Sequence, residues 1–211
     1  MMDQNLVLIG YAVPLLLGLV LISPMSQSLV SSFVERQPRL AHERRRHMLG
    51  LNLVALTGFV VSVHTLWITN KISEGGNVCS SATVFSCDDV LGNAAYNTDP
   101  FFGISWGLIG MFAFGALLFI TNSVSKEPDA LWAESYLKYG KYMTGGGVLV
   151  IALLVSYEVQ MGKICQFCTM AHIANVVCLA GFWKAGKMHD EGRWNDELTE
   201  NSPFWKNKQE D

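Results

Sequence analysis

The stretch that decides the fold is MTGGGVLVIALLVSYEVQMGKICQFCTMAHIANVVCLAGFWK, residues 143–184. Two apolar runs, about Met143–Met161 and Phe167–Lys184, flank a short polar segment that carries a C-x-x-C motif, Cys165 and Cys168. Each run is close to the roughly 20 apolar residues that a membrane-spanning helix requires. Because only a few residues join the runs, we expect two antiparallel neighbouring helices with the two thiols at the end that they share.

Three further apolar runs precede this hairpin, at about Leu6–Ile22, Met48–Thr69 and Phe101–Thr121. Half of the 211 residues are hydrophobic and only 16% are charged, and a soluble protein of this size would have to bury five such helices. We therefore predict an all-α integral membrane protein. The residues before the first run carry no positive charge, so we expect a retained helix instead of a cleaved signal peptide.

The basic residues predict how the helices are oriented, because Lys and Arg collect in cytoplasmic loops. Thirteen of the fifteen fall on one side of the predicted membrane. They are Arg36, Arg39, Arg44, Arg45, Arg46, Lys126, Lys138, Lys141, Lys184, Lys187, Arg193, Lys206 and Lys208. We therefore expect the N-terminus outside, the C-terminus in the cytoplasm, and the C-x-x-C at the outer face of a bacterial inner membrane.

A second cysteine pair, Cys79 and Cys87, lies in the polar outer loop of residues 70–100 and so on the same face. That face is the periplasm, where disulfides form and persist. A C-x-x-C can close to a disulfide and reopen by exchange, and a helix N-terminus favours the reactive thiolate. Two pairs on one face indicate a relay in which the loop pair meets a soluble dithiol. The membrane pair then needs an acceptor that dissolves in lipid, and a quinone fits.

Two other interpretations of the cysteines remain open at this point. The thiols could be inert and structural, or all four could bind zinc. A zinc site more usually has two to four residues between paired cysteines, whereas seven separate Cys79 from Cys87, so we predict no metal site. Cys178 stands alone in an apolar run and is expected to be a packing residue. We expect no nucleic-acid partner.

The combined motifs resemble the vitamin K epoxide reductase (VKOR) family over about Met48–Lys184. The resemblance rests on Cys79 and Cys87 followed by Asp88-Asp89-Val90-Leu91, on Phe102-Gly103 before a membrane helix, and on Cys165-Gln166-Phe167-Cys168 opening the last one. It implies a four-helix membrane bundle with one extra N-terminal transmembrane helix. The corresponding divisions are residues 1–47, a catalytic core at 48–186 and a charged tail at 187–211.

The resemblance also implies roles for individual residues. Cys79 and Cys87 would be the shuttle pair and Cys165 and Cys168 the active-site pair, with Cys87 exchanging with Cys165 and Cys168 facing the quinone. His172 stands where the family places a polar quinone contact.

Further candidates for quinone binding are Asn93, Asp99 and Trp106. Asn93 replaces a serine common in the family, Asp99 is also suited to cap the next helix, and Trp106 could instead face lipid. Gly103-Ile104-Ser105 replaces the family's frequent Gly-x-Pro, which puts details of the pocket in doubt.

The expected function is a thiol-disulfide oxidoreductase that reoxidises a periplasmic, DsbA-like thioredoxin-fold partner and reduces ubiquinone or menaquinone. The absence of a fused thioredoxin domain implies that this partner is separate. One alternative within the family is a reductase of a quinone or its epoxide, as in the vitamin K cycle. The other is a non-catalytic membrane protein with structural or zinc-binding cysteines.

Overall fold

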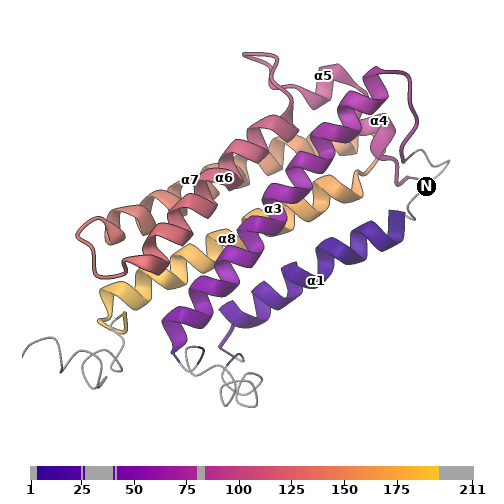
Figure 1. The fold of residues 1–211 in the computed structure, drawn as a ribbon. Helices are drawn as coiled ribbons and strands as arrows, with labels where there is room; N and C mark the ends of the chain where they lie inside the picture. The colour runs from indigo at the N-terminus through magenta and orange to yellow at the C-terminus, as the bar shows by residue number, and fades with distance from the viewer. Residues whose placement is uncertain (1–3, 25, 27–39, 41, 80–83, 195–211) are drawn as a thin grey trace, which may run out of the picture.

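The described part of the chain is a bundle of five long helices with two short ones at one end (Figure 1). The computed structural model describes residues 4–24, 26, 40, 42–79 and 84–194. The helices are α1 (Gln4–Ile22), α3 (Glu43–Ser73), α4 (Cys87–Leu91), α5 (Ala94–Asn97), α6 (Trp106–Lys126), α7 (Ala133–Met161) and α8 (Gln166–Asp190). All five long helices have the length and apolarity to cross a membrane. The predicted all-α, multi-pass membrane fold is confirmed.

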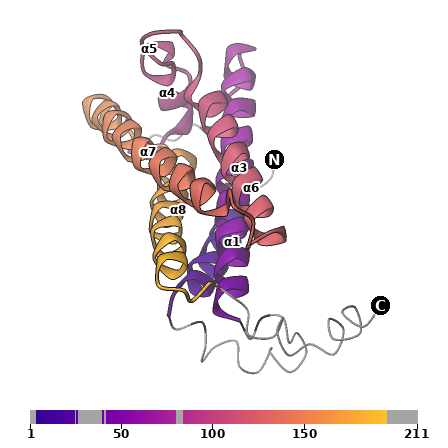
Figure 2. The same cartoon turned by 90° about the vertical axis from the view of Figure 1, so that its left-hand side faces the viewer.

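Helix α3 is the centre of the bundle, because α1, α6 and α8 all pack against it. Helix α7 packs on α8 and α6, which completes a bundle of α3, α6, α7 and α8. Helix α1 lies outside these four, against α3 and α8. Figure 2 shows α7 diverging from α6 toward the end that carries α4 and α5. The two ends of the bundle therefore differ in structure.

Two glycines allow α1 to pack tightly on the core. A Cβ added to Gly18 would lie 2.8 Å from the carbonyl oxygen of Gly50 on α3 and 2.5 Å from a methyl group of Val54. Small residues at a membrane helix crossing let two backbones approach closely, and van der Waals packing then holds them together. At the end of α1, the Lys184 ammonium of α8 donates to the carbonyl of Ile22 at 3.0 Å. Helix α1 is thus fixed to the core at two levels.

Several helix boundaries differ from the predicted ones, and the starts of α6 and α7 have identifiable causes. Helix α6 begins at Trp106 and not at Phe101, because the Asp99 carboxylate accepts backbone N–H groups of the intervening turn and the Ser105 hydroxyl caps the helix. Helix α7 begins at Ala133, ten residues before the predicted start at Met143. Its additional turns are polar and lie beyond the apolar run, so hydropathy alone did not indicate them.

Replacing Gly18 with Ala should destabilise the protein, since the new methyl group has no space between α1 and α3. Overpacking of this kind costs roughly 1–3 kcal/mol, which lowers the thermal midpoint of a protein of this size by several degrees. The matched control is Gly10→Ala in the same helix, where an added Cβ meets no atom within 4 Å. Thermal unfolding in detergent measures both. Equal midpoints for the two variants would contradict the close α1–α3 crossing.

Candidate active site

A short backbone pairing brings the outer loop to the start of α8. The N–H of Ile164 donates to the carbonyl of Val84 at 2.9 Å, and the N–H of Ser86 donates to the carbonyl of Ile164 at 3.2 Å. These two bonds form a single parallel bridge between Phe85 and Ile164. Cys87 and Cys165 each follow this bridge closely along the chain. The pairing therefore sets the cysteine of the loop beside the first cysteine of the C-x-x-C.

The four cysteines form a consecutive chain of sulfur contacts. The Cys87 sulfur is hydrogen-bonded to the thiols of both Cys79 and Cys165, and the Cys165 thiol is also hydrogen-bonded to Cys168. All four are free thiols, and all but Cys168 are buried. The structure thus places the sulfurs in the order Cys79, Cys87, Cys165, Cys168, in which each is next to the one that it would exchange with.

Cys87 carries the negative charge of this cluster. Its sulfur accepts hydrogen bonds from the thiols of Cys165 and Cys79 and from the backbone N–H groups of Phe167 and Gln166, which together lower the pKa of Cys87 to about 3. Unpaired N–H groups at a helix N-terminus stabilise an anion. The N–H groups at the start of α8 therefore serve the loop cysteine as well as the C-x-x-C, in which the N–H of Cys168 binds the Cys165 sulfur.

The two sulfurs that flank Cys87 are held in the protonated form. The hydrogen bond to Cys87, together with burial, raises the pKa of Cys79 far above its usual range. Burial raises the pKa of Cys165 in the same direction, and hydrogen bonds to Cys168 and Cys87 add to the effect. Cys165 is the N-cap of α8, where its sulfur accepts the N–H of Cys168 at 3.3 Å. When all four cysteines are reduced, the thiols of Cys79 and Cys165 thus both donate hydrogen bonds to the Cys87 thiolate.

Asp88 fixes the position of Cys79. Its carboxylate accepts the backbone N–H of Cys79 at 3.0 Å and that of Val78 at 3.1 Å. The neighbouring Asp89 points outward to Lys163 at 3.2 Å, and its side chain is 53% exposed. Asp88 therefore holds the loop segment that carries Cys79 against α4, on which Cys87 lies.

Glu158 joins α7 to the thiols. Its carboxylate accepts the N–H of Cys165 at 3.0 Å, and its side chain is buried. The turn at Gly162, with φ of 62°, reverses the chain within a few residues, so that the last turn of α7 lies directly against Cys165.

A small cavity lies between the start of α6, the end of α7 and the C-x-x-C. Its volume is about 40 Å³. It is lined by Val90, Leu91, Tyr96, Asn97, Trp106, Leu154, Tyr157, Glu158, Met161 and Cys168. The indole Nε1 of Trp106 is buried there without a hydrogen-bond partner. A buried donor without a partner is costly, and it would be satisfied by an acceptor bound in the cavity.

This geometry has a counterpart among known families. A family model described as the vitamin K epoxide reductase family matches residues 49–183, well over half of the chain. The chain belongs to the vitamin K epoxide reductase family. Comparisons with the curated proteins and with the solved structures found no significant match. As a VKOR family member the protein is a membrane oxidoreductase. Helix α1 lies outside the matched residues, in agreement with the predicted extra helix.

Of the four quinone contacts predicted from the VKOR resemblance, Trp106 alone is among the residues that line this cavity. Asp99 accepts N–H groups of Phe101, Phe102 and Ile104, which lower its pKa, with Phe102 having the largest effect. Its carboxylate therefore organises the turn before α6.

The other two predicted quinone contacts, Asn93 and His172, are not among the residues that line this cavity. Asn93 caps α5 by accepting the N–H of Ala95, and its side chain is exposed. His172 is half-buried on α8. Their contact with a quinone stays a prediction.

The cavity also contains residues that sequence reasoning missed. Asn97 is buried and donates to the carbonyl of Leu91 at 2.7 Å and to the Thr69 hydroxyl, so it ties α5 to α4 and α3. Tyr96 packs against Tyr157 of α7 with ring centroids 5.1 Å apart. No pattern in the sequence indicated these residues, since each reaches the cavity only through the packing of α5 on the bundle.

On the opposite side of the thiols, α1 contributes to the site. The Tyr11 hydroxyl lies 3.0 Å from Nδ1 of His64, whose ring packs edge-on against Phe167 with centroids 4.8 Å apart. Phe167 in turn supplies one of the N–H groups bound to Cys87. Tyr11 packs with the cluster of buried residues that includes Cys79, Cys87 and Cys165. The extra helix is therefore a wall of the VKOR site.

No group of three or more His, Cys, Asp or Glu side chains in the described part of the chain is arranged to hold a metal ion.

We predict that Asp88→Ala weakens the Cys79–Cys87 disulfide by about tenfold or more, because hydrogen bonds to a charged group contribute roughly 1.5–3 kcal/mol each. The purified protein is equilibrated in glutathione buffers of known redox ratio, and its free thiols are then alkylated. The fraction of Cys79 and Cys87 that escapes alkylation gives the equilibrium constant for forming their disulfide. Asp89→Ala is the matched control, since an exposed ion pair contributes little. An unchanged equilibrium in Asp88→Ala would show that the carboxylate does not position Cys79.

Proposed function

We propose that the protein is a thiol-disulfide oxidoreductase that reoxidises a periplasmic thioredoxin-fold, DsbA-like partner and passes the electrons to ubiquinone or menaquinone. The observation that carries this proposal is the uninterrupted series of sulfur contacts from Cys79 to Cys168. Disulfide exchange requires a thiolate next to the sulfur that it attacks, and the series supports the proposal because each sulfur lies next to the one that it would attack. The two pairs would thus work in sequence.

The exchange begins when Cys165 and Cys168 form a disulfide and Cys87 is a thiolate. The Cys87 sulfur attacks Cys165, the Cys87–Cys165 bond forms, and Cys168 leaves as a thiolate. Cys79 then loses its proton and attacks Cys87, which forms the Cys79–Cys87 disulfide and releases Cys165 as a thiolate. Two electrons have moved from the loop pair to the C-x-x-C. The loop disulfide then oxidises the dithiol of the partner by the same chemistry.

The cavity beside Cys168 is the proposed quinone site. When bound, a quinone supplies an acceptor for the two electrons and two protons that leave the Cys165/Cys168 dithiol as its disulfide reforms. The unpartnered Trp106 Nε1 would donate a hydrogen bond to a ring oxygen. The Glu158 carboxylate borders both the cavity and Cys165, so it can hold a proton between them.

The cavity must widen before a quinone ring fits. Its volume of about 40 Å³ is well below the roughly 300 Å³ or more of typical ligand pockets. Tyr96 of α5 and Tyr157 of α7 meet at its wall. Their separation would open the cavity where α7 diverges from α6 (Figure 2). We infer that the ring enters between these two tyrosines.

The proposed orientation places the site at the periplasmic face of a bacterial inner membrane. The thiols lie at the end of the bundle with α4 and α5, where α1 begins and α3 ends (Figure 1). Most of the basic residues belong to the opposite end, which the positive-inside rule assigns to the cytoplasm. An oxidising compartment at the thiol end suits a protein that makes disulfides.

The proposal is tested by thiol-dependent quinone reduction. The purified protein receives a reduced DsbA-like protein as donor and ubiquinone or menaquinone in turn, and quinone absorbance is followed. We expect reduction by the wild type and by Cys178→Ala, whose thiol lies outside the sulfur series. Cys79→Ala and Cys165→Ala should each fall to background. Unchanged reduction in these two variants would exclude the relay.

A further inference from the structure

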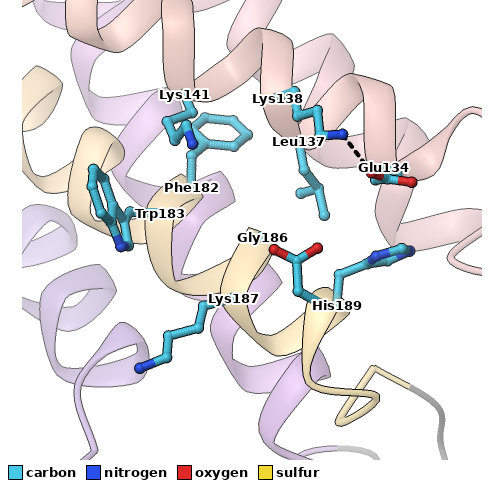
Figure 3. A pocket seen from close by; sticks show the side chains of 10 residues that line it. Glu134, Leu137, Lys138, Lys141, Phe182, Trp183, Gly186, Lys187 and His189 are labelled. Atoms are coloured by element: carbon cyan, nitrogen blue, oxygen red, sulfur yellow. Dashed lines mark hydrogen bonds and ion pairs between the residues drawn. The ribbon is translucent and has the colours of Figure 1, made fainter.

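The end of the bundle opposite the thiols contains a larger cavity, of about 250 Å³, between the first turns of α7 and the last turns of α8 (Figure 3). It is lined by Glu134, Leu137, Lys138, Lys141, Phe182, Trp183, Gly186, Lys187, His189 and Asp190. The lining combines an apolar floor with charged groups of both signs. It is separate from the redox site, and the proposed relay makes no use of it.

Most of the charges at this cavity are already paired. Lys138 binds Glu134 at 2.5 Å, and Lys187 lies 3.6 Å from Glu191. The side chains of Lys141 and Asp190 differ, since neither forms a hydrogen bond or ion pair with another described side chain, although Asp190 is near enough to Lys138 to interact with it electrostatically. The Lys141 ammonium instead lies over the rings of Trp183 and Tyr142, at 5.2 and 5.7 Å from their centroids. Among the described residues, one cation and one anion around this cavity thus have no directly bonded partner of opposite charge.

The level of this cavity in the membrane follows from the length of α7. Its 29 residues span about 43 Å, whereas the hydrocarbon core is about 30 Å thick. The polar first turns of α7 must therefore reach the headgroup layer. Trp183 and Tyr142 are 64% and 68% exposed at the same end, as expected for aromatic residues at a membrane interface. The cavity lies where phospholipid headgroups are.

We propose that this cavity binds the headgroup of a phospholipid with a phosphate and a primary ammonium, of the phosphatidylethanolamine type. Lys141 would bind the phosphate and Asp190 the ammonium, so that the two side chains without an ion pair meet the two charges of one zwitterion. A headgroup with a phosphate alone would leave Asp190 unpaired beside an anion. A choline headgroup offers no N–H donor to the carboxylate.

The test uses the full-length protein, delipidated in detergent and then titrated separately with phosphatidylethanolamine, phosphatidylglycerol and phosphatidylcholine. Native mass spectrometry counts bound lipid and gives its affinity. We expect one phosphatidylethanolamine per chain, bound about tenfold or more tighter than the other two, since a hydrogen bond to a charged group changes affinity by at least that factor. Equal binding of the three lipids would overturn the proposal.

Two variants test the assigned contacts. Lys141→Gln should weaken phosphatidylethanolamine about tenfold, and Asp190→Asn should abolish its preference over phosphatidylglycerol. The controls are Lys126→Gln and Asp129→Asn, which lie at the same end, are exposed, and do not line the cavity. Wild-type selectivity in both test variants would contradict the site. Binding of soluble phosphoethanolamine or inorganic phosphate as tightly as the lipid would show a free-phosphate site and would also overturn it.

Discussion

The pairing of the outer loop with Ile164 is the interaction on which the redox site depends. Two backbone hydrogen bonds join Val84 and Ser86 to this one residue, and they place Cys87 beside Cys165. Without these bonds, Cys87 would not be held near Cys165. Disulfide exchange between them would then first cost the entropy of closing the long stretch of chain that separates them. The pairing also presents Cys87 to the N–H groups that open α8. Geometry and charge at the site therefore have a common origin.

The thiol cluster contacts different kinds of residues on its two sides. On one side, Glu158 holds the N–H of Cys165 and borders the cavity with Trp106 and Cys168, where polar groups meet apolar walls. On the other side, Tyr11 brings α1 against the thiol cluster. This wall is built by a helix outside the residues that the family model matches. The polar contact of Glu158 and the aromatic packing of Tyr11 thus lie on different sides of the same sulfurs.

The sequence predicted the membrane helices because length and apolarity are local properties, and it predicted the extra helix for the same reason. It missed the start of α6, because the turn before that helix depends on the Asp99 carboxylate. It also did not indicate that helix N–H groups reach the loop cysteine, Cys87. Which sulfur meets them depends on how the loop docks, and neither composition nor spacing encodes that. Asn97 went unrecognised since its place at the cavity arises from tertiary packing alone.

The central claim is that electrons pass between the pairs through Cys87 and Cys165. It is tested most directly by a double variant, Cys79→Ala with Cys168→Ala, which leaves these two sulfurs as the only members of the series. After mild oxidation, peptide mapping should find a Cys87–Cys165 disulfide in most chains. The matched variant Cys79→Ala with Cys165→Ala should form a Cys87–Cys168 disulfide far more slowly. Equal rates in the two variants, or a Cys165 that remains a free thiol in the first, would contradict the relay.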